Sequence, residues 1–370
     1  MVSTLLTIIV FILILSVLVF VHEFGHFVVA RLFGVHVEEF GFGLPPRAIG
    51  KKIHGTIYSL NWLPIGGFVK LAGEDAEDID REKNSVKTKQ GRSHYFWAKS
   101  KKERIAILLA GVTMNFILAI GITGFLLSRG IVEQTPRVRI ETVVAQSPAQ
   151  AAGVLVGDVI HSITVTTNGK KEEVQPTKPE MVVEAVNAHK GERIVMTLDR
   201  NGTVVSFSMI PRINPPAGQG ALGVQLNNYE RHVYLWREIP LKSVEVTFSR
   251  AYQMLYSMGD MVVRLVTGKT VKSEEVSGPV GIAKVVGDSM KYGWEAVLEI
   301  VSILSLNLAI LNVLPFPALD GGRILFVVLE KLGKKARPQV ERIIHQIGMM
   351  ILLGLLLLIT VNDILRIVRG

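Results

Sequence analysis

Two histidines and a glutamate lie together in the motif His22-Glu23-Phe24-Gly25-His26, near the amino terminus of the 370-residue chain. On a helix, this spacing places both imidazoles on one face with the glutamate beside them. Imidazoles arranged in this way bind zinc, which lowers the pKa of a bound water toward ~7 so that the glutamate can move its proton to a leaving amine. The motif therefore predicts a zinc site with His22 and His26 as ligands and Glu23 as the general base.

The chain has nine histidines, so a chance occurrence of the motif is the alternative. The location argues against chance, because the motif ends an uncharged stretch in which ionisable groups would be costly in lipid. The other histidines, including His345 near the start of the last apolar stretch, have no partner at ligand spacing. We expect them not to bind metal, and we expect His345 to lie at the membrane interface.

A catalytic zinc usually has three protein ligands, and Asp320 is the candidate for the third. It lies in the segment Asn312-Val-Leu-Pro-Phe-Pro-Ala-Leu-Asp-Gly-Gly-Arg323, at the far end of another apolar stretch. Pro315 and Pro317 must interrupt regular helix there, which a membrane tolerates only beside a cavity or inside protein. Without the first motif, a helix cap or an interfacial carboxylate would be the alternative for Asp320.

These residues must be positioned by membrane helices, because four stretches without charged side chains approach the length needed to cross a bilayer. The chain is 49% hydrophobic, and its apolar residues are concentrated in these blocks. The first stretch has no basic residue before it and no small-residue cleavage pattern after it, so it predicts a retained span rather than a signal peptide. The four expected spans are 5–21, 105–128, 300–319 and 346–362.

Lysine and arginine are concentrated in the segments 31–104 and 331–342, and positive residues in short loops are retained on the cytoplasmic side. We therefore expect the amino terminus and the region between the second and third spans to lie outside. The net charge of +9 follows from this topology, and no aromatic-interleaved basic motif indicates nucleic acid as a partner. The chain has no cysteine, which excludes disulfides and thiolate ligands.

The two motifs resemble those of the site-2 protease family of intramembrane zinc metalloproteases, and more closely its bacterial RseP-type members, over nearly the whole chain. The residues that carry the resemblance are HEFGH at 22–26 and NVLPFPALDGG at 312–322. One departure is Gly111-Val112, where such proteins often have Gly-Pro before the asparagine that corresponds to Asn115, which weakens inference about Asn115. Supporting matches are Gly-Phe-Gly at 41–43, Pro-Ile-Gly-Gly-Phe-Val-Lys-Leu-Ala-Gly-Glu at 64–74 and Ser-Gly-Pro-Val-Gly-Ile-Ala at 277–283.

The resemblance implies that Zn2+ is held by His22, His26 and Asp320, that Glu23 is the general base, and that Asn312 positions substrate. From the residues alone, an interhelical hydrogen bond is an equal alternative for Asn312. The implied substrates are transmembrane proteins in membrane lipid, such as anti-sigma factors or remnant signal peptides. The implied location is the bacterial inner (cytoplasmic) membrane, with the active site near its cytoplasmic side.

Residues 56–71 are expected to be extended, with a break at Pro64, Gly66 and Gly67. The segment is similar to the family's membrane-associated hairpin, whose edge strand pairs with an unwound substrate. By that similarity we expect Gly66, Gly67 and Phe68 to bind substrate, with a plain cytoplasmic loop as the alternative. The charged residues 74–104 predict a solvated cytoplasmic connection.

The region outside the membrane is expected to hold one PDZ domain. Residues 147–160 resemble the PDZ signature, 179–189 fits its groove helix, and two alternating runs surround the turn Asn201-Gly202. The domain could bind a newly exposed carboxyl terminus or act as a steric gate. Apolar residues on one helical face of 240–268 predict an interfacial helix that follows it.

The predicted fold class is an α-helical polytopic membrane protein with four transmembrane helices, a membrane-associated β-hairpin and an inserted α+β PDZ domain. The predicted regions are 1–135 with spans one and two, 136–213 as PDZ domain, 214–295 as linker and interfacial helix, and 296–370 with spans three and four. The predicted function is regulated intramembrane proteolysis by zinc-activated water. A non-proteolytic adaptor with a structural metal site is the alternative, but such a site would not need Glu23. A zinc transporter is least favoured, because the ligands cluster on one side.

Overall fold

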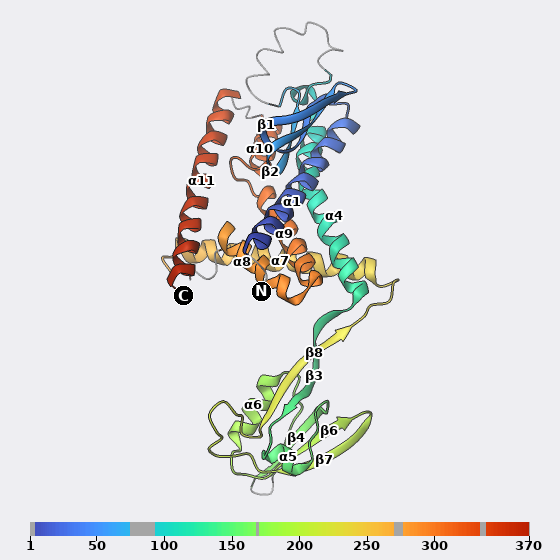
Figure 1. Cartoon of the computed structure of the whole chain (residues 1–370), viewed down its shortest axis with the longest axis vertical. Coiled ribbons are helices and arrows are strands. Elements are labelled where there is room, and N and C mark those ends of the chain that lie inside the picture. Colours follow the sequence, from blue (N-terminus) through green and yellow to red (C-terminus); the bar gives the residue numbers. More distant parts are fainter. Residues whose placement is uncertain (1–3, 75–92, 168–169, 270–276, 334–337, 370) are drawn as a thin grey trace. The chain divides into compact units, whose positions relative to one another are not determined.

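The computed structural model describes residues 4–74, 93–167, 170–269, 277–333 and 338–369. The chain forms two compact units, Met1–Ser128 together with Leu235–Gly370, and Arg129–Tyr234 (Figure 1). The first unit contains every residue of the predicted zinc site, and the second contains the predicted PDZ region.

Four helices of the described chain are long and apolar enough to cross a membrane, which agrees with the four predicted spans. The first helix continues past the predicted end at Val21, so the His22–His26 motif lies inside a helix and not at its end. The four helices are α1 (Thr4–Leu32), α4 (Lys101–Arg129), α9 (Trp294–Val313) and α11 (Pro338–Arg369).

The third membrane helix is shorter at its carboxyl end than predicted. It ends at Val313 instead of residue 319, and α10 (Asp320–Lys331) begins after the non-helical segment 314–319. Leu314 is extended, with φ −62° and ψ 140°, because a residue before proline is disfavoured in helical geometry. The two prolines therefore interrupt the helix as expected, and Asp320 starts a new helix.

The membrane helices pack through small and polar side chains. Between α4 and α9, Thr123 and Ser302 share a hydroxyl hydrogen bond of 3.1 Å, and the Ser305 hydroxyl donates to the Asn115 carbonyl at 2.9 Å. The apolar contact beside them contains Ala119, Leu306 and Ile310. Interhelical hydrogen bonds and close packing are the interactions that hold helices together where lipid removes the hydrophobic driving force.

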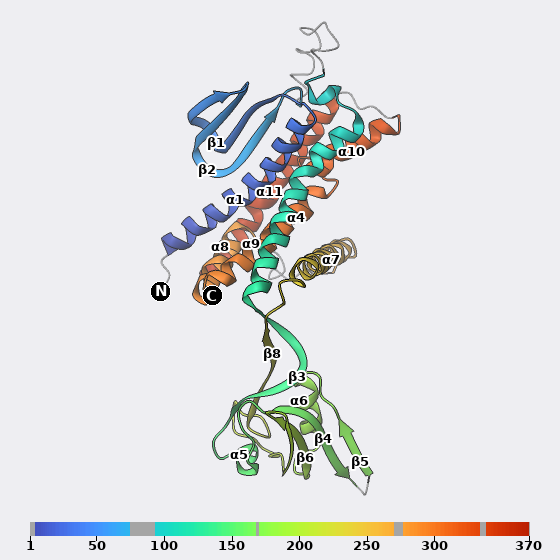
Figure 2. The same cartoon turned by 90° about the vertical axis from the view of Figure 1, so that its right-hand side faces the viewer.

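Strands β1 (Val37–Ile53) and β2 (Thr56–Leu71) form the predicted hairpin sheet. Residues 39–42 of β1 pair with 67–70 of β2 and also with 57–60, so the segment 67–70 is an edge of the sheet. Figure 2 shows this sheet beside α1. The Ser16 hydroxyl of α1 donates to the Pro64 carbonyl at 2.7 Å, which ties the bend of β2 to the middle of the helix. Of the predicted connection 74–104, residues 75–92 lie outside the described residues.

Helix α8 (Pro279–Ser289) is anchored to α11 by a buried carboxylate. The Gly281 amide donates to Asp363 Oδ2 at 2.7 Å, and Asp363 is 3% exposed. A carboxylate at the first turn of a helix satisfies an amide without an intrahelical partner. The predicted amphipathic helix at 240–268 is α7 (Ile239–Val266), which Arg250 joins to Glu299 of α9. Single helical turns occur at Phe96–Ala98 and Met290–Tyr292.

The second unit is a sheet with strand order β7-β6-β4-β3-β8, with β5 paired to β4. Its core packs strand residues such as Ile140, Ile163 and Leu198 against Val182 and Val186 of the helix α6. The elements are β3 (Ile131–Val143), α5 (Pro148–Ala152), β4 (Val159–Thr167), β5 (Lys170–Val174), α6 (Pro179–Ala188), β6 (Ile194–Arg200), β7 (Thr203–Met209) and β8 (Val224–His232).

This unit is longer than the predicted 136–213. Strand β8, which lies in the predicted linker, pairs with β3 from Ile131–His232 to Val143–Val224 and thereby belongs to the sheet. The predicted turn at Asn201-Gly202 is confirmed, since both residues have positive φ, 52° and 84°, as a two-residue hairpin turn requires.

Candidate metal centre

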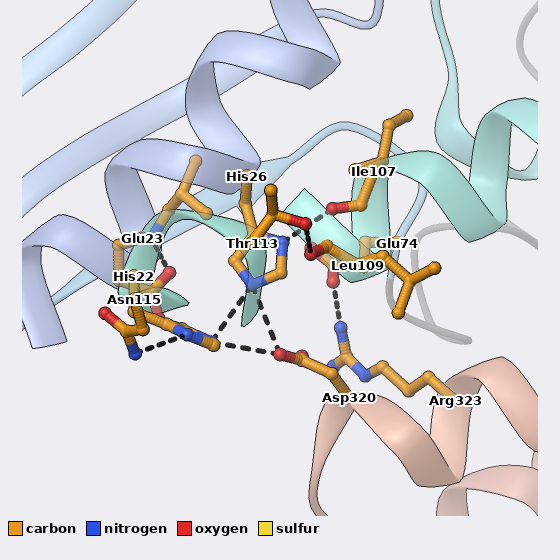
Figure 3. A network of polar contacts seen from close by, with 11 residues as sticks. His22, Glu23, His26, Glu74, Ile107, Leu109, Thr113, Asn115, Asp320 and Arg323 are labelled. Atoms are coloured by element: carbon orange, nitrogen blue, oxygen red, sulfur yellow. Dashed lines mark hydrogen bonds and ion pairs between the residues drawn. The ribbon is translucent and has the colours of Figure 1, made fainter. Parts of the chain in front are cut away.

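Helix α1 presents both motif histidines to the same point inside the first unit. Their Nε2 atoms lie 3.2 Å apart, and each residue is 6% exposed. The arrangement follows from helical spacing, because residues four apart lie on one face. The predicted pair is therefore formed within an unbroken helix (Figure 3).

Asp320 reaches the same point from the first position of α10. Its Oδ2 atom lies 2.9 Å from Nε2 of His22 and 3.3 Å from Nε2 of His26. The start of α10 is packed tightly, since a Cβ on Gly321 would lie 2.1 Å from the Leu314 carbonyl oxygen. The structure thus brings together all three predicted ligands, although His22 and Asp320 are 298 residues apart in the sequence.

The three ligand atoms fit a zinc ion by chemistry and by spacing. They lie within 4.8 Å of one another. Ligands at ~2.0–2.1 Å from a tetrahedral zinc are roughly 3.3–3.4 Å apart, close to the distances between these atoms. The Nδ1 atom of His26 is 2.8 Å from the Ile107 carbonyl, which only accepts, so Nδ1 carries the hydrogen and Nε2 offers its lone pair to the site. Two imidazole lone pairs and a carboxylate at this spacing suit a divalent cation.

Asn115 of α4 supports His22 from behind. It is fully buried, and its amide nitrogen Nδ2 lies 3.3 Å from Nδ1 of His22, while its amide oxygen has no hydrogen-bond partner among the described residues. A histidine that binds metal through Nε2 carries its hydrogen on Nδ1, and the Asn115 side chain would accept that hydrogen once its amide is turned so that the oxygen takes the place of Nδ2. The motif departure at Gly111-Val112 therefore does not displace Asn115 from the site.

Gly111 is a site residue that the sequence analysis missed. A Cβ at this position would lie 2.4 Å from Nε2 of His26 and 2.7 Å from Nε2 of His22. Helix α1 also approaches α4 closely at Gly25, where a Cβ would lie 2.4 Å from the Ala110 carbonyl oxygen. Glycine is thus needed where α4 crosses the histidines, and a single sequence carries no signal for that crossing.

Glu23 points toward the hairpin. Its Oε2 accepts a hydrogen bond from the Val69 amide at 3.1 Å. The predicted substrate-binding residues Gly66, Gly67 and Phe68 come directly before Val69, the last two on the same edge, and the Gly66 amide lies 3.4 Å from the Ser16 hydroxyl. The structure therefore places this edge beside the predicted general base.

Asn312 is half-buried near the end of α9 and makes no hydrogen bond that joins it to the network in Figure 3 among the described residues. The sequence did not indicate one ion pair that involves the helix beginning at Asp320. Arg323 of α10 forms an ion pair with Glu74, which follows β2, and so connects the hairpin to the helix that begins at Asp320.

Comparisons with known proteins agree with this centre. The pattern of Peptidase family M50 matches residues 10–355. A relative from Clostridium perfringens, provisionally named a zinc metalloprotease, is 33% identical over 352 residues, which cover 95% of this chain and 96% of the relative. Zinc metalloprotease RasP of Geobacillus kaustophilus is 29% identical over an alignment of 436 positions, which covers 98% of this chain and 99% of RasP. The chain therefore belongs to peptidase family M50, the site-2 protease family, and is a membrane zinc metalloprotease.

Proposed function

We propose that this protein hydrolyses a peptide bond within a membrane-spanning segment of a single-pass protein, with zinc held by His22, His26 and Asp320. The observation that carries the proposal is the convergence of these three ligand atoms, with Glu23 beside them, between helices long enough to cross a membrane. Zinc in this site would supply Lewis-acid polarisation of the scissile carbonyl and of water.

Glu23 is the proposed general base. Its carboxylate takes the proton of the attacking water and then delivers it to the leaving amine. The hydrogen bond from the Val69 amide to Oε2 fixes one carboxylate oxygen and leaves the other to accept the proton. The substitution Glu23→Gln would keep the shape and the amide contact but remove the base.

The hairpin edge is the proposed binding surface for the opened substrate. A peptide bond inside a helix must be exposed before hydrolysis, and an added strand gives the opened backbone hydrogen-bond partners. Gly67 and Phe68 lie on this edge and Gly66 directly precedes it, and the next residue after Phe68 is Val69, whose amide contacts Glu23. A substrate strand along 66–69 would therefore pass the general base. Asn312, in the last turns of α9, would contact the substrate from the side of the 314–319 segment.

We further propose that the active site lies near the cytoplasmic side of a bacterial inner membrane and that residues 129–234 lie outside. The lysines and arginines of 31–104 and 331–342 support this orientation. The outer unit is proposed to be a single PDZ domain, supported by its antiparallel sheet and the helix α6. This unit would either bind a newly exposed carboxyl terminus as an added strand or exclude substrates that carry a bulky external domain.

Cleavage of a tagged single-pass substrate in detergent tests the proposal. Wild-type protein should produce fragments whose masses place the cut inside the apolar segment, and Glu23→Gln or a zinc chelator should abolish them. The matched control is Glu245→Gln, which alters an exposed carboxylate paired with Lys242 on α7, away from the site. Cuts outside the apolar segment, or unchanged cleavage by Glu23→Gln, would contradict the proposed activity.

A further inference from the structure

We infer that His345 of α11 is a positioning residue that holds the 314–319 segment, and through it Asp320, in the geometry of the zinc site. The inference rests on the proposed role of Asp320 as a ligand. His345 does not contact the ligand atoms. Its Nδ1 accepts a hydrogen bond of 2.9 Å from the amide of Ala318, two residues before Asp320.

The segment 314–319 has few ways to stabilise itself. Pro315 and Pro317 have no amide hydrogen to donate. The amides of Leu314, Phe316 and Leu319 donate to carbonyls of their own segment or of the adjoining end of α9. The Ala318 amide is different, because its acceptor is a side chain of another membrane helix.

The conformation that this bond holds is an unfavourable one. Ala318 has φ +80°, a left-handed conformation that residues with a Cβ rarely adopt. Such a conformation persists when the surrounding structure fixes it. Downstream, Gly322 sits so close to the segment that a Cβ would lie 2.4 Å from the Phe316 carbonyl oxygen. Asp320 lies between these two constrained points, so the path of the segment sets where its carboxylate lies.

Helix α11 is placed for this role at two successive turns. Beyond His345, a Cβ on Gly348 would lie 2.4 Å from the Pro317 Cβ, so the helix backbone packs directly on the segment. The Phe326 ring of α10 packs against His345, with ring centres 5.5 Å apart. The imidazole is therefore held between the helix that begins with Asp320 and the last membrane helix.

The chemistry of the bond fixes the state of the imidazole. A backbone amide only donates, so Nδ1 of His345 must offer a lone pair and the hydrogen must be on Nε2. Nε2 is buried without a hydrogen-bond partner among the described residues. Among these residues, the polar function of His345 is thus its bond to Ala318, and a side chain that accepts at the same place should replace it.

The inference is tested by measuring the zinc affinity of two variants in which an amide side chain replaces His345. In His345→Asn the amide oxygen lies near the position of Nδ1 and can accept from Ala318, whereas the longer side chain of His345→Gln places its oxygen near the position of Nε2. After equilibration with a chelator, we expect His345→Gln and His345→Leu to bind zinc about 10–100-fold more weakly than wild type, as for other groups that orient ligands. His345→Asn should stay within about threefold of wild type, as should Gly354→Ala, a change on the same helix with no neighbour within 4 Å.

Two further readings separate the possible failures. Thermal unfolding of the same samples shows whether a variant loses zinc because it unfolds. If unfolding is the cause, the Asn and Gln variants should lose zinc equally, and the inference is wrong. Wild-type zinc affinity in His345→Leu also overturns it. The variant Asp320→Asn tests the proposed function separately. If it keeps wild-type zinc affinity, Asp320 is not a ligand, whereas loss of zinc in Asp320→Asn but not in His345→Gln removes only the role of His345.

Discussion

At the scale of single residues, the absence of a side chain at Gly111 is as important to the site as the ligands. The position faces both Nε2 atoms at 2.4 and 2.7 Å from a would-be Cβ, so a methyl group would occupy space that the ligands and the metal need. Since both histidines and Asn115 are buried, the neighbouring side chains have little room to move away.

The substitution Gly111→Ala is therefore expected to lower zinc affinity at least tenfold and to lower cleavage in proportion. The physical reason is the steric clash of the new methyl group with the two imidazoles. Loss of helix is not the reason, because alanine is more favourable than glycine in a helix by ~1 kcal/mol and should not unfold α4. Zinc content after chelator treatment measures the effect. Gly121→Ala on the same helix, with no neighbour within 4 Å, should keep wild-type zinc. Equal zinc content in the two variants would refute the steric argument.

At the scale of elements, a buried carboxylate in the second unit connects two neighbouring strands of the sheet. Asp158, before β4, is 2% exposed in its side chain and accepts from both Nε and Nη2 of Arg200 at the end of β6, at 2.8 and 2.7 Å. These hydrogen bonds, together with one from the Leu155 amide, hold the pKa of Asp158 below its usual range despite burial. The pair joins the loop before β4 to the neighbouring strand.

This pair predicts an acid-sensitive unit. Because the folded pKa of Asp158 is below its unfolded value of ~3.9, its contribution is fully present above that pH and is lost as the pH falls through the folded pKa. Asp158→Asn should lower the unfolding free energy of this unit by about 1–3 kcal/mol at pH 7 and flatten its decline below pH 4. Urea unfolding of the whole chain, followed by a fluorophore on Val204→Cys, measures both effects. An unchanged acid slope in the Asn variant would exclude Asp158 as the cause.

At the scale of the whole molecule, the proposed orientation makes the second unit and the hairpin accessible from different sides of the membrane. The chain has no cysteine, so each introduced thiol is the only one present. In intact bacterial cells, a membrane-impermeant maleimide should label Lys190→Cys in the second unit but label Lys52→Cys of β1 only after permeabilisation. The reverse pattern would overturn the assignment of the positive loops to the cytoplasm.

The sequence predicted what local spacing encodes. The four spans, the pairing of His22 with His26, the interruption at Pro315 and the Asn201-Gly202 turn all depend on residues close together in the chain. Asp320 could be matched to them because a third ligand was required at similar depth. Contacts between distant segments, such as Gly111 with the histidines and Arg323 with Glu74, depend on tertiary packing that hydropathy does not encode. His345, expected at the membrane interface, was in this way missed as a partner of Ala318.

The central claim, that His22, His26 and Asp320 hold the catalytic zinc while Glu23 acts on water, is tested most directly by zinc content per chain. After loading with zinc and removal of the excess ion by gel filtration, wild type and Glu23→Gln should each retain about one zinc, because Glu23 is not a ligand. His26→Ala and Asp320→Ala should retain little, since each removes one of three ligands. Zinc retained at the wild-type level by Asp320→Ala, or lost from Glu23→Gln, would contradict the account.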